Sequence, residues 1–270
     1  MIILKIGGSI ITNKDSIEPE VDYDNLNRIS GEIAEAYNNE SLDIADGLII
    51  VHGAGSFGHP PAKKYKIGEP FTNEEYPLKR KGFSEIVLSM KKLNLCVCES
   101  LLKQGIPVVP IQTSAVVKAY DKRINDFDLK MIKTYLKEGY VPVLYGDVVI
   151  DDKLKMSILS GDQIIEYVAS FLASDRVVLG TDVDGVYDKN PKIHEDAKLI
   201  EKVSSLDDIT QLESTVNVDV TGGMIGKVKE LLTLADNGVD SEIINANKPG
   251  IISKCLQGEK VKGTKITKKQ

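Results

Sequence analysis

Short apolar runs that alternate with longer helix-like segments constrain the fold of this chain more than any other feature. Several of these runs are apolar at consecutive positions, a pattern typical of parallel strands buried on both faces. The expected strands are residues 2–6, 47–51, 107–111, 141–145, 176–180 and 242–245. The expected helices are residues 23–37, 79–104, 128–138, 162–173 and 224–236. The alternation predicts a three-layer α/β/α sandwich with a mainly parallel central sheet.

Local signals and the chain length refine this organisation. Gly105, Gly139 and Gly238 follow three of the expected helices, where glycine commonly forms a C-terminal cap. Residues 147–159 predict a β-hairpin with a polar tip. A chain of 270 residues forms one large domain or two lobes that share a sheet. We expect lobes of residues 1–173 and 174–270 on one continuous sheet, because no linker separates them.

The composition excludes several classes of protein. A formal net charge of −6 argues against a nucleic-acid-binding surface. No apolar run approaches the roughly 20 residues of a membrane span, and the first residues predict a strand and not a cleaved leader. The chain has three cysteines, Cys96, Cys98 and Cys255, and we expect them to be free thiols in a reducing cytoplasm.

A glycine-rich run, VHGAGSFGH at residues 51–59, follows the second expected strand. Gly53, Gly55 and Gly58 match Gly-x-Gly-x-x-Gly, the fingerprint of nicotinamide-dependent oxidoreductases. That fingerprint also requires a helix, a second strand and an acidic residue about 20 positions later. Residues 60–77 instead contain four prolines and no apolar strand. We therefore interpret the run as a loop that holds phosphate groups in another fold, with an oxidoreductase as the alternative from a different class.

The two histidines of this run have different predicted roles. His52 lies at the end of the strand, where a hydrogen-bonded structural histidine is the simpler interpretation. His59 lies beyond the last glycine and near Lys63 and Lys64. Its ring is therefore a candidate hydrogen-bond donor to an anion.

Further motifs follow expected strands or precede expected helices, where α/β proteins bind ligands. KIGGS (residues 5–9) places a lysine inside an apolar strand, so Lys5 lies either at a sheet edge or beside a phosphate at the glycine loop. YGD (145–147) and SGD (160–162) pair glycine with aspartate, and Asp162 caps a helix, orients Lys5, or does both. TDVDGVYDKNPK (181–192) fits a nucleotide, and TGGMIGK (221–227) places Lys227 near a helix N-terminus that favours anions.

These motifs, in this order, resemble the amino acid kinase family over nearly the whole chain. The matching pieces are KIGGS, HGAG, YGD, SGD, TDVDGVY with Pro191, and TGGM with Lys227. Within the family, GAGSFGHP with His59 is similar to the isopentenyl phosphate kinases, although a branch of phosphonate kinases carries a similar histidine. The resemblance implies transfer of a phosphoryl group from ATP to isopentenyl phosphate, with Mg²⁺ as a cofactor. It also implies a homodimer.

The same resemblance implies roles for individual residues. Catalytic roles would belong to Lys5, Lys14, His59, Asp162 and Lys227. The implied ATP-binding residues are Lys5, Gly7, Gly8, Ser9, Gly55, Asp182, Tyr187, Pro191, Lys192, Gly223 and Lys227. The implied acceptor-binding residues are Ala54, Gly55, His59, Gly161, Phe83, Ile86 and Ile158. Residues 1–173 would then hold the acceptor phosphate and catalytic lysines, and residues 174–270 would bind ATP.

A phosphate monoester is a suitable acceptor because its second pKa of about 6 leaves it anionic at neutral pH. No general base is then needed, and positioning and positive charge bring the two anions together. No tight carboxylate cluster is visible in the sequence, so we expect Mg²⁺ to be held by ATP oxygens and water. Other kinases of this fold act on carboxylates, carbamates, nucleoside monophosphates or phosphonates, and these remain alternatives. A catalytically silent nucleotide sensor is disfavoured by the presence of Lys5, Lys14, His59 and Lys227.

Overall fold

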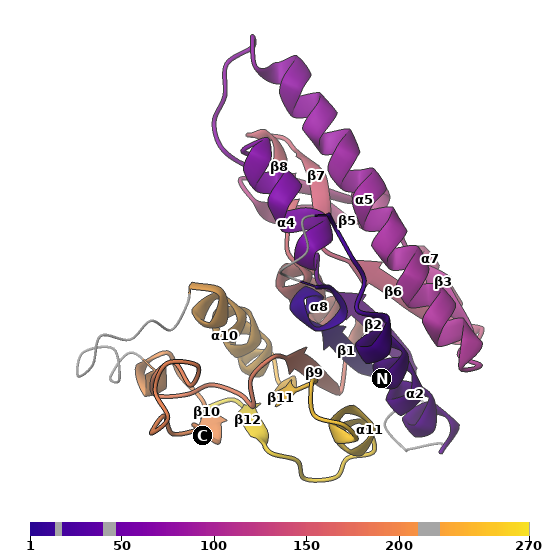
Figure 1. Ribbon diagram of the computed structural model, residues 1–270, viewed down its shortest axis with the longest axis vertical. Helices are drawn as coiled ribbons and strands as arrows, with labels where there is room; N and C mark the ends of the chain where they lie inside the picture. The colour runs from indigo at the N-terminus through magenta and orange to yellow at the C-terminus, as the bar shows by residue number, and fades with distance from the viewer. Residues whose placement is uncertain (14–17, 40–46, 210–221, 270) are drawn as a thin grey trace.

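The computed structural model describes residues 1–13, 18–39, 47–209 and 222–269. Figure 1 shows the elements from β9 onward gathered at one end, with the long helix α5 along the rest of the molecule. In chain order the elements are β1 (Ile2–Ile6), α1 (Gly8–Ile11), α2 (Tyr23–Asn38), β2 (Leu48–His52), α4 (Gly55–Lys64), α5 (Tyr76–Lys103), β3 (Val108–Pro110), α6 (Thr113–Val116), β4 (Val117–Tyr120), β5 (Arg123–Phe127), α7 (Lys130–Lys137), β6 (Val141–Tyr145), β7 (Asp147–Asp151), β8 (Lys155–Leu159), α8 (Gly161–Leu172), β9 (Arg176–Thr181), β10 (Lys202–Val203), α10 (Gly222–Asp236), β11 (Asp240–Asn245), α11 (Ile251–Leu256) and β12 (Gly263–Ile266).

The described strands form two sheets. The larger sheet has the order β10-β12-β11-β9-β1-β2-β6-β3, and the smaller one has the order β5-β4-β7-β8. The central neighbours β11, β9, β1, β2 and β6 are parallel, whereas β12 is antiparallel to β11. One sheet therefore contains strands from both sides of residue 173. The division of the chain into two functional lobes at that position remains a prediction.

The large sheet is covered on both faces, as its unbroken apolar strands predict. Side chains alternate along a strand, so Ile2, Leu4 and Ile6 pack into a core with α2, α5 and α11. Ile3 packs into a second core on the opposite face, with α8 and α10. The predicted α/β/α sandwich with a mainly parallel sheet is confirmed. No described helix is long and apolar enough to cross a membrane.

Most predicted elements agree with the structure to within three residues. The strands predicted at residues 2–6 and 141–145 match β1 and β6, and the predicted hairpin is β7 with β8. Gly105, Gly139 and Gly238 have φ angles of +86°, +79° and +86° after their helices, the left-handed conformation that a glycine cap requires. The hairpin of β4 and β5 was not predicted, because its strands are only four and five residues long and more than half of their side chains are exposed.

The glycine-rich run differs most from its prediction. Residues 55–64 form helix α4 and not a loop, although Pro60 and Pro61 lie inside the helix. The ring nitrogen of Pro61 cannot donate to the carbonyl of Phe57. Ser89 of α5 donates its hydroxyl to that carbonyl instead, at 2.8 Å. The loop prediction is wrong because a contact between two helices replaces the hydrogen bond that proline removes.

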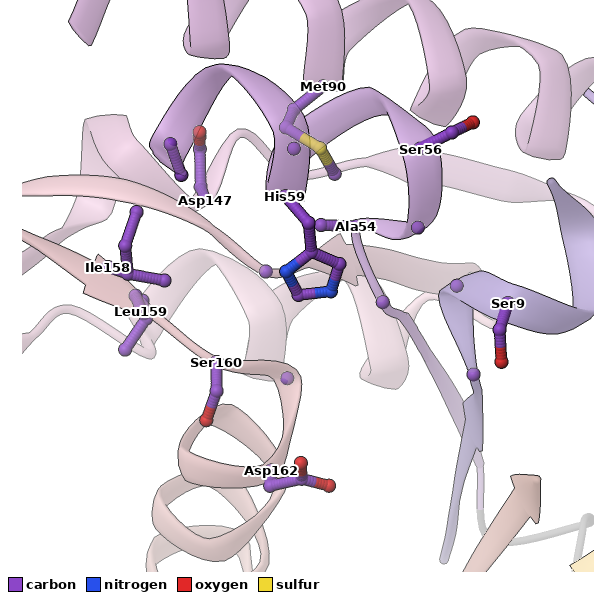
Figure 2. Close-up of a pocket in the computed structure, with 18 of the residues that line it drawn as sticks. Ser9, Ala54, Ser56, His59, Met90, Asp147, Ile158, Leu159, Ser160 and Asp162 are labelled. Carbon is purple, nitrogen blue, oxygen red and sulfur yellow. The ribbon is translucent and has the colours of Figure 1, made fainter. Parts of the chain in front are cut away.

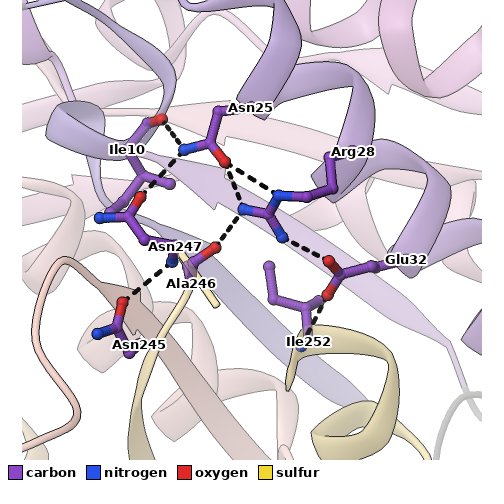
Figure 3. A network of polar contacts seen from close by, with 8 residues as sticks. All are labelled: Ile10, Asn25, Arg28, Glu32, Asn245, Ala246, Asn247 and Ile252. Atoms are coloured by element: carbon purple, nitrogen blue, oxygen red, sulfur yellow. Dashed lines mark hydrogen bonds and ion pairs between the residues drawn. The ribbon is translucent and has the colours of Figure 1, made fainter. Parts of the chain in front are cut away.

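A polar network joins α2 to the chain that follows β11 (Figure 3). Arg28 donates from Nη2 to the carbonyl oxygen of Ala246 at 2.5 Å, and it forms an ion pair with Glu32 one turn along α2. Glu32 is buried and also accepts a hydrogen bond from the backbone N–H of Ile252 at 3.0 Å. The buried carboxylate thus has two partners, which offset the cost of removing its charge from water.

Candidate active site

Four adjacent parallel strands, β9, β1, β2 and β6, end at one cavity of about 560 Å³. The residues directly after these strands all line the cavity; they are Asp182, Gly7, Gly53 and Gly146. Ligand sites of open α/β sheets lie outside the carboxyl ends of parallel strands. The structure therefore brings motifs that are far apart in the sequence to one candidate site.

Asp162, near the N-terminus of α8, joins two lysines at the charged end of this cavity. Its Oδ1 accepts a hydrogen bond from Lys5 Nζ at 2.6 Å, and its Oδ2 accepts one from Lys227 Nζ at 3.2 Å. Lys5 lies on the central strand β1 with 6% of its side chain exposed. The alternative of a lysine at a sheet edge is therefore wrong. Ser160 forms the N-cap of α8, which leaves the Asp162 carboxylate for the lysines.

Burial and neighbouring charges shift the pKa values of Lys5 and Asp162 in this Lys5–Asp162–Lys227 cluster. Burial lowers the pKa of Lys5, while the attraction of Asp162 opposes that change. Burial also disfavours ionised Asp162, but the two lysines outweigh it and hold the pKa of the carboxyl below its usual value. The carboxylate thus stays ionised, and two ammonium groups against one carboxylate leave an excess positive charge facing the cavity. Such a site favours a polyanionic ligand.

The glycines of two sequence motifs pack backbone against backbone. A Cβ atom on Gly8 would lie 2.8 Å from the carbonyl carbon of Gly53, and one on Gly55 would lie 2.6 Å from the carbonyl oxygen of Gly8. Gly55 also has a φ of +50°, in the left-handed region that favours glycine. In α4, a Cβ atom on Gly58 would lie 3.2 Å from the sulfur of Met90. The apparent dinucleotide fingerprint is therefore a packing requirement of the segments that build the cavity.

His59 projects from α4 into the cavity (Figure 2). No described residue forms a hydrogen bond with its ring. Partial burial, followed by the charges of Lys227 and Lys5, lowers the pKa of His59 below its usual 6.5. The imidazole is therefore neutral at pH 7 and presents an N–H donor to a ligand in the cavity.

Apolar side chains form another part of the cavity wall. Ile86 and Met90 lie one turn apart on α5, and Ile158 and Leu159 end β8. Figure 2 shows Ile158, Leu159 and Met90 arranged around His59. Of the predicted tail-binding residues, Ile86 and Ile158 line the cavity, whereas Phe83 does not and packs partly buried against the core.

His52 is a buried structural residue behind the site, as predicted. Its Nδ1–H donates to the carbonyl of Gly53 at 3.0 Å, and its Nε2 accepts from the amide of Asn94 at 3.1 Å. Its ring stacks on Tyr145 with 5.4 Å between centroids. Burial lowers the pKa of His52 to about 4, so the ring stays neutral. These contacts fix the backbone of Gly53 where it packs against Gly8.

The residues predicted to bind ATP fall into two groups. Gly7, Gly8, Ser9, Gly55 and Asp182 line the cavity together with Lys5 and Lys227. Tyr187, Pro191, Lys192 and Gly223 do not line it: Lys192 Nζ pairs with the Asp182 carboxylate at 2.6 Å, and the Tyr187 hydroxyl donates to Asp184 at 3.1 Å. Gly223 lies in the first turn of α10, which carries Lys227. Lys14 lies outside the described residues, as does Thr221.

The predicted acceptor-phosphate residues Ala54, Gly55, His59 and Gly161 all line the cavity. Ser56, Asp147 and Thr181 also line it, and sequence analysis assigned them no role. Asp147 accepts hydrogen bonds from the backbone N–H groups of Val148 and Ser114, and burial raises its pKa. Each of the three lies within two residues of a strand end or next to an assigned glycine. That position is the signal that identifies them.

The chain is similar to known proteins over nearly its whole length. A profile of the Amino acid kinase family matches residues 1–245. The chain is 54% identical to an isopentenyl phosphate kinase of Methanothermobacter thermautotrophicus over 100% of both chains. It is 41% identical to an isopentenyl phosphate kinase of Methanocaldococcus jannaschii over 98% of both chains. An X-ray structure of an isopentenyl phosphate kinase has 50% identity and a TM-score of 0.88, covering 99% of this chain and 100% of that one.

Proposed function

The chain belongs to the amino acid kinase family, and on this basis we propose that it transfers the terminal phosphoryl group of ATP to isopentenyl phosphate. One observation in the structure carries the proposal: a single cavity combines the Lys5–Asp162–Lys227 cluster, the ring of His59, which has no hydrogen-bond partner among the described residues, and an apolar wall. The cluster suits the phosphates of ATP, the histidine suits a second phosphate, and the wall suits a short hydrocarbon tail.

The proposed reaction is an in-line displacement at phosphorus. An oxygen of the acceptor phosphate forms a bond to the γ-phosphorus of ATP, and the bond from that phosphorus to the β,γ-bridging oxygen breaks. Lys5 and Lys227 offset the negative charge on the transferring group, while Asp162 holds both ammonium groups in place. His59 donates its N–H to the acceptor phosphate. Proton removal is not required, because the acceptor oxygen is already anionic at neutral pH.

The remaining predicted residues complete the two proposed subsites. Gly7, Gly8 and Ser9 would offer donors to the ATP phosphates, and the backbone of Ala54, Gly55 and Gly161 would support the acceptor phosphate. The other residues are assigned by family resemblance, with Lys14 at the transition state and Asp182, Tyr187, Pro191, Lys192 and Gly223 near ATP. Residues 174–270 would then contribute most of the nucleotide site.

Mg²⁺ would neutralise charge on the ATP phosphates. Within the described ranges, no three His, Cys, Asp or Glu side chains gather as a metal site. Asp162 faces the cavity but is already engaged by Lys5 and Lys227. Such a site, with no free carboxylate cluster among the described residues, fits a Mg²⁺ that is held mainly by phosphate oxygens and water. The ion commonly adopts that coordination with nucleotides.

A panel of acceptors tests the proposed function. With ATP and Mg²⁺, isopentenyl phosphate is expected to give a kcat/KM at least about 100-fold above those of glutamate, UMP and a short alkylphosphonate. ADP release and ³¹P NMR of the diphosphate product measure the reaction. Isopentenol, which has the same tail and no phosphate, is the matched control and should not react. Preference for a carboxylate, or NAD binding without ATP binding, would overturn the proposal.

We also propose a homodimer that forms through α5. Leu88, Leu95 and Leu102 lie seven residues apart on this helix and are 61%, 57% and 61% exposed. Leucines at this spacing form one apolar stripe along a helix, and such stripes pair with a second helix.

Leu95→Glu is expected to convert the dimer to a monomer, because it places a charge in the middle of the stripe. Light scattering after size-exclusion chromatography measures the mass. Met131→Glu, at an exposed apolar position on α7, is the matched control and should leave the dimer intact. A monomeric wild-type protein, or a dimer that survives Leu95→Glu, contradicts this assignment.

A cytoplasmic location is part of the proposal. Cys96, Cys98 and Cys255 are free thiols. Burial raises the pKa of Cys98 and Cys255 to about 12, which keeps both as unreactive thiols. Thiols that are left unpaired are typical of proteins in a reducing compartment.

A further inference from the structure

Helices α8 and α10 meet along a row of polar side-chain pairs that begins at the active site. Asp162 and Lys227 form the first pair, at 3.2 Å. The last pair is Ser170 of α8 with Asn237, the residue directly after α10, whose amide donates to the serine hydroxyl at 3.4 Å. Positions three or four apart on a helix share a face, so the residues between these pairs occupy the same row.

The middle of the row brings two like charges together. Glu166 is one turn beyond Asp162 on α8, and Glu230 is one turn beyond Lys227 on α10. Their side chains are only 17% and 16% exposed. Burial, followed by the charge of Glu230, raises the pKa of Glu166. Two ionised carboxylates in this position repel each other, and a cation between them removes that repulsion.

Arg123 supplies that cation from a different element, the first residue of β5. Its Nη1 and Nη2 donate to the two carboxylate oxygens of Glu230 at 2.5 and 3.0 Å. The same Nη2 lies 3.5 Å from Oε2 of Glu166. A two-pronged guanidinium contact of this kind restricts geometry more than a lysine does.

The position of Arg123 is itself well defined. The preceding turn residues, Asp121 and Lys122, have positive φ angles, and their backbone N–H groups donate to the carboxylate of Asp151 at 3.1 and 2.8 Å. Asp151 is buried, and it also accepts from the backbone N–H of Leu154 in the neighbouring hairpin turn. The guanidinium is therefore presented from a backbone that the second sheet holds in place.

We propose that Arg123 is a positioning residue that holds α10 against α8 and so keeps Lys227 on Asp162. The proposal rests on the phosphoryl-transfer function given above, in which Lys227 contacts the transferring group. Arg123 neutralises Glu166 and Glu230 one helical turn from the Asp162–Lys227 pair. Without it, the repulsion between the glutamates separates the helices where Lys227 must be aligned, while the apolar wall formed by α5 and β8 is unaffected.

Removal of Arg123 and then of one glutamate charge tests this role. Arg123→Met is expected to lower kcat about tenfold and to leave the KM for isopentenyl phosphate within about twofold. Arg123→Met/Glu166→Gln removes the repulsion as well, and its kcat is expected to return to within about threefold of wild type. Lys118 lies on the same β4–β5 hairpin as Arg123 and forms an exposed ion pair with Asp152. Lys118→Met, which breaks that ion pair, is the matched control. It should behave as wild type.

A second measurement reports the position of Lys227 without ATP or acceptor. Acetic anhydride should modify Lys227 faster in Arg123→Met than in wild type, and the double variant should restore the slow rate; peptide mass spectrometry measures both. An unchanged kcat and labelling rate in Arg123→Met, or no recovery in the double variant, overturns the proposal. If Arg123→Met does not fold, the proposal is tested with the double variant alone. That variant is expected to fold and to react, and its failure to do so overturns the proposal. A wild-type protein inactive on isopentenyl phosphate refutes the proposed function, whereas the labelling rates still test Arg123.

Discussion

His59→Ala is expected to lower kcat/KM for isopentenyl phosphate about 100- to 1,000-fold, the usual cost of losing one donor to a charged reacting group. The ring lines the cavity, and no described residue occupies its nitrogens, so its N–H is available to the acceptor phosphate. The KM for ATP should change little, because the Lys5–Asp162–Lys227 cluster is intact. Steady-state kinetics with each substrate varied in turn measures both effects.

His59→Gln is the matched control, because glutamine keeps an N–H donor of similar reach. It should retain more activity than the alanine variant. An alanine variant with unchanged turnover removes His59 from the mechanism. A variant that loses ATP affinity instead would place the histidine in the nucleotide site.

The lowered pKa of His59 also predicts the pH dependence of the wild-type enzyme. Because the pKa of His59 is lowered below its usual 6.5, the neutral ring predominates at pH 7 and above. Since kcat/KM reports groups in the free enzyme, it should not fall between pH 7 and about 8 through loss of a proton from His59. A fall across this range that His59→Gln abolishes would show that the imidazolium is the active form.

Gly8→Ala is expected to have the second large effect, on stability as well as activity. The new methyl group would lie 2.1 Å from the backbone nitrogen of Gly55 and 2.8 Å from the carbonyl carbon of Gly53, and backbone atoms do not move aside as a flexible side chain does. The free energy of unfolding should fall by at least about 3 kcal/mol. Urea denaturation measures this loss, and the folded fraction should have a reduced kcat because the displaced segments carry the cavity wall.

Gly31→Ala is the control for this substitution. Gly31 lies inside α2, and no atom lies within 4 Å of the position that its Cβ would take. Alanine favours a helix over glycine, so the variant should be more stable by about 0.5–1 kcal/mol. Equal effects of the two substitutions would contradict the close packing of Gly8 against Gly53 and Gly55.

The glycine-rich run shows which structural features local sequence can and cannot predict. Its position after an apolar strand correctly placed it at the ligand-binding edge of the sheet, since parallel strands align their carboxyl ends. The same residues were predicted to be a loop, and they form helix α4. The hydroxyl of Ser89 supplies the hydrogen bond that Pro61 cannot make in this helix. Ser89 lies 28 residues beyond Pro61 in the chain, on another helix. No local pattern reports such a contact.

Most of the strands and helices and the α/β/α layers follow from the amino-acid sequence, because periodicity and glycine positions are local properties of the chain. The candidate catalytic residues follow from its resemblance to the amino acid kinase family. Three contacts form only when the chain is folded. They are the pairing of Lys5 and Lys227 with Asp162, the packing of Gly8 against Gly53 and Gly55, and the bridge from Arg123 to Glu166 and Glu230. Each of these joins residues that lie at least 40 positions apart in the chain. Charge pairing and backbone contact act over a few ångströms, and only the arrangement of the strands and helices determines which distant residues come that close.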